Sequence, residues 1–155
     1  IPLFVEGGIF IPTAREYRLG DHVYVLLTLP DDPQRYPVAG KVAWVVADIT
    51  GWHPPRAYDV WHDRAVFHFL TSADDRAAYV RQVARSVRLG GHVIVATFGL
   101  DGPEKCSGLD VVRYDAENLH GEFGPKFRLL DSVTEVHETP WGTPQQFMYC
   151  FCRME

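Results

Sequence analysis

The sequence has no long apolar run, no excess of basic residues and no even set of cysteines. No apolar run approaches the roughly 20 residues that a membrane-spanning helix needs. Of the 155 residues, 15 are Lys or Arg and 20 are Asp or Glu, so the net charge of −5 offers no basic field for nucleic acid. The three cysteines fit no paired disulfide framework. These absences predict a cytoplasmic protein that binds neither membrane nor nucleic acid.

The sequence also lacks a recognisable metal site or catalytic group. Cys150 and Cys152 share one face of a predicted strand, but no second ligand pair stands at a suitable spacing, so buried thiols are expected. His62 and His68 have no third and fourth metal ligand, and a satisfied core histidine is the expected role of His68. Ser107 has no acid–base partner nearby. We therefore assign no catalytic residue and no metal ligand.

Residues 58–98 are the most regular part of the chain. The order there is an apolar strand, a polar turn, an amphipathic helix and a second apolar strand, which predicts a parallel strand pair with a buried crossover. Ser72 can cap the helix, with Asp75 three residues later. Gly90 and Gly91 are expected to end it. The apolar face of the helix recurs at three- and four-residue spacing, at Tyr79, Val80, Val83, Ala84 and Val87.

The first third of the chain has a different composition and different predicted elements. Residues 3–11, 22–29 and 38–45 are rich in β-branched and aromatic residues and predict strands. Turn residues at 12–21 and 30–33 leave no room for a helix between them. Short strands with short connections pair antiparallel, so we expect a small barrel or meander.

Later segments complete the predicted sheet. Residues 45–50 predict a strand ending in Asp48, followed by a rigid loop over 51–55. Asp115 can cap a short helix that runs to Phe123. Beyond it, turn residues separate two predicted strands that form a terminal hairpin, residues 127–138 and 145–153.

Three short segments in the first third of the chain resemble a PilZ domain of the pilus-biogenesis subtype. They are residues 7–13, 19–21 and 37–44. The resemblance covers about residues 3–45. Receptor members of that family hold cyclic di-GMP with an arginine pair, and of the corresponding turn only Gly8 is present here. Phosphate clamping needs that arginine chemistry, so cyclic di-GMP binding is not expected. The resemblance implies a protein partner from type IV pilus assembly.

From residue 45 to the end, the sequence resembles the carboxyl-terminal part of the class I S-adenosylmethionine-dependent methyltransferases. The sequence segments that carry the resemblance are residues 47–50, 58–70, 89–92, 98–103, 112–115 and 135–142. The resemblance implies S-adenosylmethionine as the cofactor and a small molecule as the methyl acceptor. It also places five residues near the cofactor: Asp48, Ile49, His62, Asp63 and Arg64.

These site predictions have structural alternatives. Asp48 can simply end a strand, and Asp63 with Arg64 can form a local ion pair of little energetic value. Trp52, Trp61 and Trp141 are candidates for a substrate pocket, with core packing as the alternative.

The chain is predicted to have two parts, a partial PilZ-like β segment over 1–45 and a methyltransferase-like part over 46–155. The expected fold is α/β, with an incomplete Rossmann-like sheet, a terminal antiparallel hairpin on one edge and the β segment on the other. The family's first strand ends in a glycine-rich turn that approaches the cofactor, and this sequence has no such turn. Impaired or lost methyl transfer is therefore expected. A non-catalytic interaction module and an inactive folded fragment are the alternatives, so enzyme status stays open.

Overall fold

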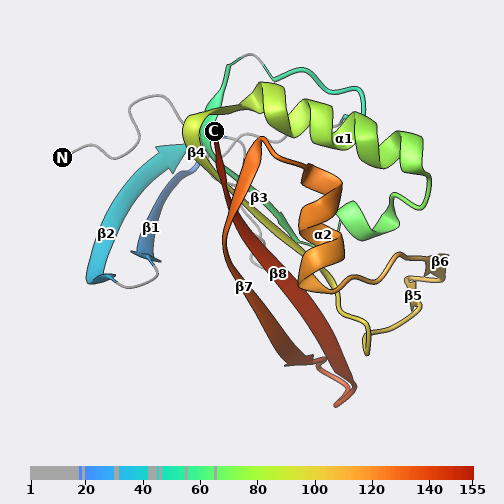
Figure 1. The fold of residues 1–155 in the computed structure, drawn as a ribbon. Coiled ribbons are helices and arrows are strands. Elements are labelled where there is room, and N and C mark those ends of the chain that lie inside the picture. The colour runs from blue at the N-terminus through green and yellow to red at the C-terminus, as the bar shows by residue number, and fades with distance from the viewer. Residues whose placement is uncertain are drawn as a thin grey trace.

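The computed structural model describes residues 18, 20–29, 32–41, 45, 47–54, 56–64 and 66–155. In this part of the chain, a four-stranded sheet carries two α-helices on one face, and two further sheets have two strands each (Figure 1). The elements in chain order are β1 (His22–Leu29), β2 (Asp32–Lys41), β3 (Tyr58–Arg64), the 3₁₀ helix η1 (Phe67–Phe69), α1 (Ala73–Ser86), β4 (Val87–Phe98), β5 (Lys105–Cys106), β6 (Leu109–Asp110), α2 (Ala116–Phe123), β7 (Phe127–Glu138) and β8 (Pro144–Met154).

The main sheet has the strand order β3-β4-β8-β7. β3 and β4 pair parallel, with Trp61 opposite Val93 and Asp63 opposite Val95. β8 runs antiparallel to both β4 and β7, so it is the single reversed strand of the four. The parallel pair and the terminal hairpin that the sequence predicts are both confirmed.

Both helices begin at the residues expected from their caps. The Ser72 hydroxyl accepts a hydrogen bond from the Asp75 amide at 3.5 Å, and the Asp115 carboxylate accepts one from the Asn118 amide at 2.8 Å. Each cap satisfies an amide that has no partner inside its helix. Gly124, with a φ of 71°, ends α2.

The main core lies between the two helices and one face of the sheet. Tyr79 and Val83 of α1 and Leu119 of α2 are completely buried there against Val93 and Val95 of β4. Alternate residues of β4 and β8 form a smaller cluster of Ala96, Phe98 and Phe147. β4 is thus buried on both faces, as its continuous apolar run predicts.

The predicted strand over 45–50 is wrong. Its described residues form no strand, and the Gly51 amide donates to the Asp48 carbonyl at 3.1 Å in a turn. The physical reason is the Asp48 side chain, whose Oδ1 accepts from the amide and the hydroxyl of Thr50 at 2.9 and 2.7 Å. Such local bonds offer the backbone an alternative to a sheet ladder.

The predicted helix end at the glycine pair is also wrong. The helix ends at Ser86, and Gly90, with a φ of +79°, lies inside β4. Its left-handed backbone coincides with the irregular pairing between Tyr58 and Val60 of β3, so the glycines bend a strand rather than close a helix.

The first third of the chain agrees in part. β1 and β2 pair antiparallel, with His22 opposite Lys41, as expected. β2 begins at Asp32, so it takes up half of the predicted turn over 30–33 and starts well before the expected strand at 38–45. The predicted strand over 3–11 lies outside the described residues. β1 and β2 form a sheet of their own rather than an edge of the main sheet.

No helix in the described part of the chain is long and apolar enough to cross a membrane.

Gly91→Ala tests the contact between β3 and β4. A Cβ at this position would lie 2.8 Å from a Val87 methyl group and 2.9 Å from the carbonyl oxygens of Arg88 and Asp59. Because two of these neighbours are backbone atoms, we expect a loss of about 1–3 kcal/mol in the free energy of unfolding, measured in urea. Gly121→Ala is the matched control, since a Cβ there meets nothing within 4 Å on α2 and should stabilise by about 0.5–1 kcal/mol. Equal effects of the two changes would contradict the packing described.

Candidate functional site at the carboxyl ends of the parallel strands

Asp63, near the carboxyl end of β3, is buried with 5% of its surface exposed. Its carboxylate accepts hydrogen bonds from the Val66 amide at 3.0 Å, from the Phe67 amide at 3.1 Å and from the Tyr79 hydroxyl at 2.6 Å. Burial raises the pKa of Asp63, while these three hydrogen bonds oppose the rise. Asp63 therefore ties the end of β3 to η1 and to α1.

Tyr79 extends this network to a tryptophan. Its hydroxyl, completely buried, also accepts a hydrogen bond from Trp61 Nε1 at 2.8 Å. Burial, followed by the charge of Asp63, raises the pKa of Tyr79 well above its usual value, so the phenol stays protonated and donates to the carboxylate. The chain of contacts runs from Trp61 through Tyr79 to Asp63.

The three predicted pocket tryptophans do not come together. Trp52 and Trp61 are neighbours, with ring centroids 6.4 Å apart, and Trp61 packs against the main core. Trp141 lies in the turn between β7 and β8 and is 88% exposed. Core packing thus describes Trp61 best, and none of the three lines the cavity described below.

The other predicted cofactor residues lie in two places. Asp48 is exposed, and hydrogen bonds from Thr50 hold its pKa below the usual value. Ile49 is half-buried against the main core. On β3, His62 is half-buried, and the Arg64 guanidinium lies 4.9 Å from the centroid of the Phe147 ring.

The proposed ion pair between Asp63 and Arg64 is not formed. The Asp63 carboxylate faces Tyr79 and η1, whereas the Arg64 guanidinium lies over Phe147 on β8. Successive residues of a strand point to opposite faces of the sheet, which separates the two charges.

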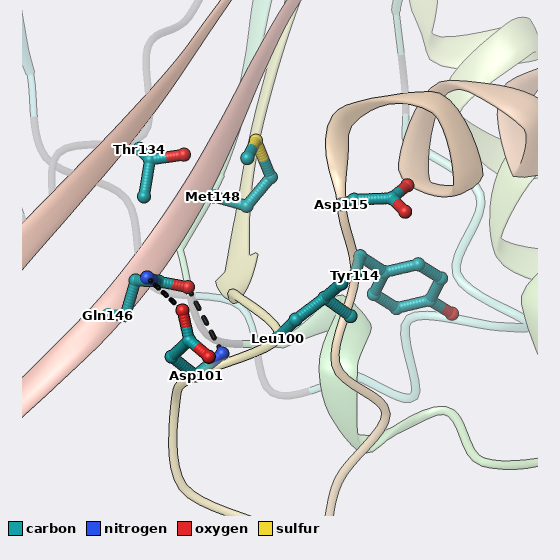
Figure 2. A pocket seen from close by; sticks show the side chains of 7 residues that line it. All are labelled: Leu100, Asp101, Tyr114, Asp115, Thr134, Gln146 and Met148. Atoms are coloured by element: carbon teal, nitrogen blue, oxygen red, sulfur yellow. Dashed lines mark hydrogen bonds between the residues drawn. The ribbon is translucent and has the colours of Figure 1, made fainter.

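A surface cavity lies where β4 ends, between the entry of α2 and the β7–β8 hairpin. Figure 2 shows the strand residues on one side and the segment that leads into α2 on the other. The cavity encloses about 220 Å³, room for roughly seven water molecules. Its lining residues are Leu100, Asp101, Tyr114, Asp115, Thr134, Gln146 and Met148.

Asp101 and Gln146 close one end of this cavity by holding each other. The Asp101 amide donates to Gln146 Oε1 at 3.2 Å, and Gln146 Nε2 donates to Asp101 Oδ2 at 3.0 Å (Figure 2). Gly99 allows this pairing, because a Cβ there would lie 2.2 Å from Gln146 Oε1. The turn after β4 is further held by Arg113, which donates to the carbonyls of Leu100 at 2.8 Å and Gly102 at 3.1 Å.

Sequence reasoning did not assign these lining residues to a site. Asp115 was expected only as a helix cap, a role that the structure confirms. The segments 98–103 and 112–115 carry the family resemblance, but the cavity needs a third and a fourth segment from β7 and β8.

His68 is buried as predicted, but it is not hydrogen-bonded. Its ring is completely buried and stacked on Phe98 with centroids 4.7 Å apart, and neither ring nitrogen has a hydrogen-bond partner among the described residues. Burial lowers its pKa to about 4, so the ring is neutral at physiological pH.

The cysteines on β8 behave as buried thiols, as predicted. Burial raises the pKa of Cys150 to about 12 and that of Cys152 to about 11. Both are therefore protonated at neutral pH. No group of His, Cys, Asp and Glu side chains suited to a metal ion occurs among the residues that the structure describes.

The fold resembles S-adenosylmethionine-dependent methyltransferases of known structure. The N-methyltransferase NodS from Bradyrhizobium japonicum matches with a TM-score of 0.56 and 12% identity over 72% of this chain and 58% of its own. A methyltransferase from Methanosarcina mazei matches with a TM-score of 0.57 and 12% identity over 82% of this chain and 72% of its own. The 1,6-didemethyltoxoflavin-N1-methyltransferase from Burkholderia thailandensis was solved with 1,6-didemethyltoxoflavin and S-adenosylhomocysteine bound. It matches with a TM-score of 0.53 and 16% identity over 71% of this chain and 49% of its own.

The chain therefore has a methyltransferase-like fold. It spans little more than half the length of NodS, the first of these structures. No family model and no curated protein sequence matches the chain. None of the structures named here is a PilZ domain, so the resemblance of residues 3–45 stays a prediction.

Tyr79→Phe tests the buried network. The change removes one donor to Asp63 and leaves Trp61 Nε1 without its acceptor, so we expect a loss of about 1–3 kcal/mol in the free energy of unfolding. Tyr24→Phe is the control, because that side chain is 81% exposed on β1. Chemical denaturation measures both, and an unchanged stability for Tyr79→Phe would rule out a structural role for the network.

His68→Phe tests the buried imidazole. The folded-state pKa of about 4 lies below the unfolded value of about 6.5, so the unfolded chain takes up the proton first. The contribution to stability is complete above pH 6.5 and is lost as the pH falls towards 4, by roughly 2–3 kcal/mol. Unfolding measured across this range should show a shallower pH dependence in His68→Phe. An identical slope in both proteins would show that His68 does not titrate as described.

Proposed function

We propose that this chain is the carboxyl-terminal part of an S-adenosylmethionine-dependent methyltransferase that acts on a small molecule. The observation that carries the proposal is the strand order β3-β4-β8-β7 with β8 alone reversed. The fold built on this arrangement resembles solved structures that bear this activity in their names, which supports a methyltransferase sheet. The toxoflavin enzyme is solved with a bound small molecule, 1,6-didemethyltoxoflavin, which supports a small-molecule acceptor here.

The cofactor supplies a methyl group on a positively charged sulfur. When bound, it would give this methyl group to a lone pair of the acceptor, the electrons of the carbon–sulfur bond would stay on sulfur, and the acceptor would lose a proton. Positioning of the two partners provides most of the rate enhancement in such a transfer, so little acid–base chemistry is required of this chain beyond uptake of the acceptor's proton by a carboxylate or by water.

The cofactor would lie beyond the carboxyl ends of β3 and β4, where open α/β sheets bind ligands. The residues near β3 fit this place in part. Asp48 offers an exposed carboxylate whose Oδ2 accepts no hydrogen bond from the residues that the structure describes, and Ile49 beside it offers apolar surface. Asp63 already accepts three hydrogen bonds, so we assign it the role of holding the end of β3 in place. His62 and Arg64 are proposed contacts on the opposite face of β3.

The glycine-rich turn of the family does not occur in this sequence. We propose that cofactor affinity is correspondingly weak, because backbone approach to the ligand depends on those glycines. The PilZ-type interaction module has only the antiparallel β1–β2 pair in its favour.

Titration calorimetry with S-adenosylhomocysteine tests the proposal. We expect measurable binding that Asp48→Asn weakens about fivefold, since the substitution removes the charge but keeps an acceptor for Thr50. Asp131→Asn is the matched control, an exposed carboxylate on β7. An absence of heat at millimolar ligand would refute cofactor binding by this chain.

A further inference from the structure

The cavity between α2 and the β7–β8 hairpin has a mixed lining. Leu100 and Met148 provide apolar surface, and the Leu100 side chain is 55% exposed. An exposed leucine at the wall of a cavity gains from being covered, because burial of apolar surface is favourable. The volume of about 220 Å³ lies below the roughly 300–1,000 Å³ of sites for drug-sized ligands, so only a small occupant fits.

The charges of the lining all have one sign. Asp101 and Asp115 are its two ionisable carboxylates, and none of the seven lining residues is Lys, Arg or His. Arg113 immediately precedes the lining residues Tyr114 and Asp115, but its guanidinium donates to the carbonyls of Leu100 and Gly102 and pairs with Glu104 at 3.2 Å. The Arg113 guanidinium therefore holds the loop, and Glu104 balances its charge.

An anion meets no cationic side chain among the lining residues, and the Thr134 hydroxyl is the neutral donor that the lining offers it. The amino end of α2 would attract one, but the Asp115 carboxylate already occupies that end through the Asn118 amide. Each carboxylate has about four acceptor positions, of which Asp101 uses one and Asp115 two in hydrogen bonds within the protein. The lining residues therefore carry free acceptor positions and no cationic side chain.

We propose that this cavity binds the methyl acceptor and that the acceptor is a small amine with an apolar body. The apolar part would cover Leu100 and Met148, and the protonated amine would be attracted by the charges of Asp101 and Asp115. Before methyl transfer, a proton would pass from the bound ammonium to a carboxylate or to water, which restores the lone pair of the nitrogen. That the occupant is the methyl acceptor rests on the proposed function, whereas the preference for an amine rests on the lining residues alone.

The test uses three probes of similar size, 2-phenylethylamine, 2-phenylethanol and 3-phenylpropanoate, added to the whole ¹⁵N-labelled chain. We expect the amine to shift the backbone amides of Leu100, Thr134 and Met148 and to bind at least fivefold more tightly than the alcohol, since charge-assisted hydrogen bonds are about twice as strong as neutral ones. The propanoate should bind more weakly than either.

Two nearly isosteric variants locate the charge. Asp101→Asn keeps an acceptor for Gln146 Nε2, and Asp115→Asn keeps a good helix cap, so both should fold. Each should weaken the amine about fivefold. Glu117→Gln removes the same charge from an exposed position on α2 outside the cavity and should leave the amine affinity unchanged.

The outcomes separate the two proposals. Propanoate bound as tightly as the amine, amine shifts away from the lining, or full affinity in both Asp variants would overturn the amine site. Amine binding without S-adenosylhomocysteine binding would overturn the methyltransferase proposal and leave the amine site standing. Binding of S-adenosylhomocysteine without binding of the amine would overturn the amine site and leave the methyltransferase proposal standing.

Discussion

The hydrogen bond between Tyr79 and Asp63 links the elements on which the rest of the structure depends. It joins the middle of α1 to the end of β3, and the same carboxylate fixes the first turn of η1. A buried carboxylate that accepts three hydrogen bonds stabilises a unique arrangement, because any displacement leaves a desolvated charge without partners. The helix layer is thereby set in register with the parallel strands.

The order of the strands decides where chemistry can occur. With β8 reversed between β4 and β7, the start of β8 lies beside the end of β4, where Phe98 pairs with Phe147. The turn after β4, the entry of α2 and the hairpin then meet at one end of the sheet. Four segments far apart in the sequence thus form one cavity, and short-range contacts between Asp101 and Gln146 hold its shape.

The sequence predicts the elements whose signals are local. The caps at Ser72 and Asp115, the apolar face of α1 and the terminal hairpin are each read from residues within one element. All four are confirmed, except that Val87, expected on the helix face, lies in β4. The strand over 45–50 fails because apolar composition says nothing of the Asp48 side chain, which bonds to Thr50 instead of leaving the backbone to a ladder.

The site was harder to predict than the fold for a related reason. Asp63 stands at a strand end, where a ligand contact and an internal anchor look alike in sequence, and only the position of Tyr79 decides between them. The cavity residues Leu100, Thr134 and Met148 carry no chemical signal of their own. They become a site only through the pairing of β8 with both β4 and β7.

The three cysteines differ in accessibility, so one of them can be labelled selectively. Cys150 and Cys152 are sealed in the core with thiols that resist deprotonation, whereas Cys106, half-buried in the loop between β4 and α2, is the accessible one of the three. A thiol-reactive fluorophore would therefore attach at one native position of the folded protein. That position lies on the same loop as two walls of the cavity, so the label would report on the loop without any engineered residue.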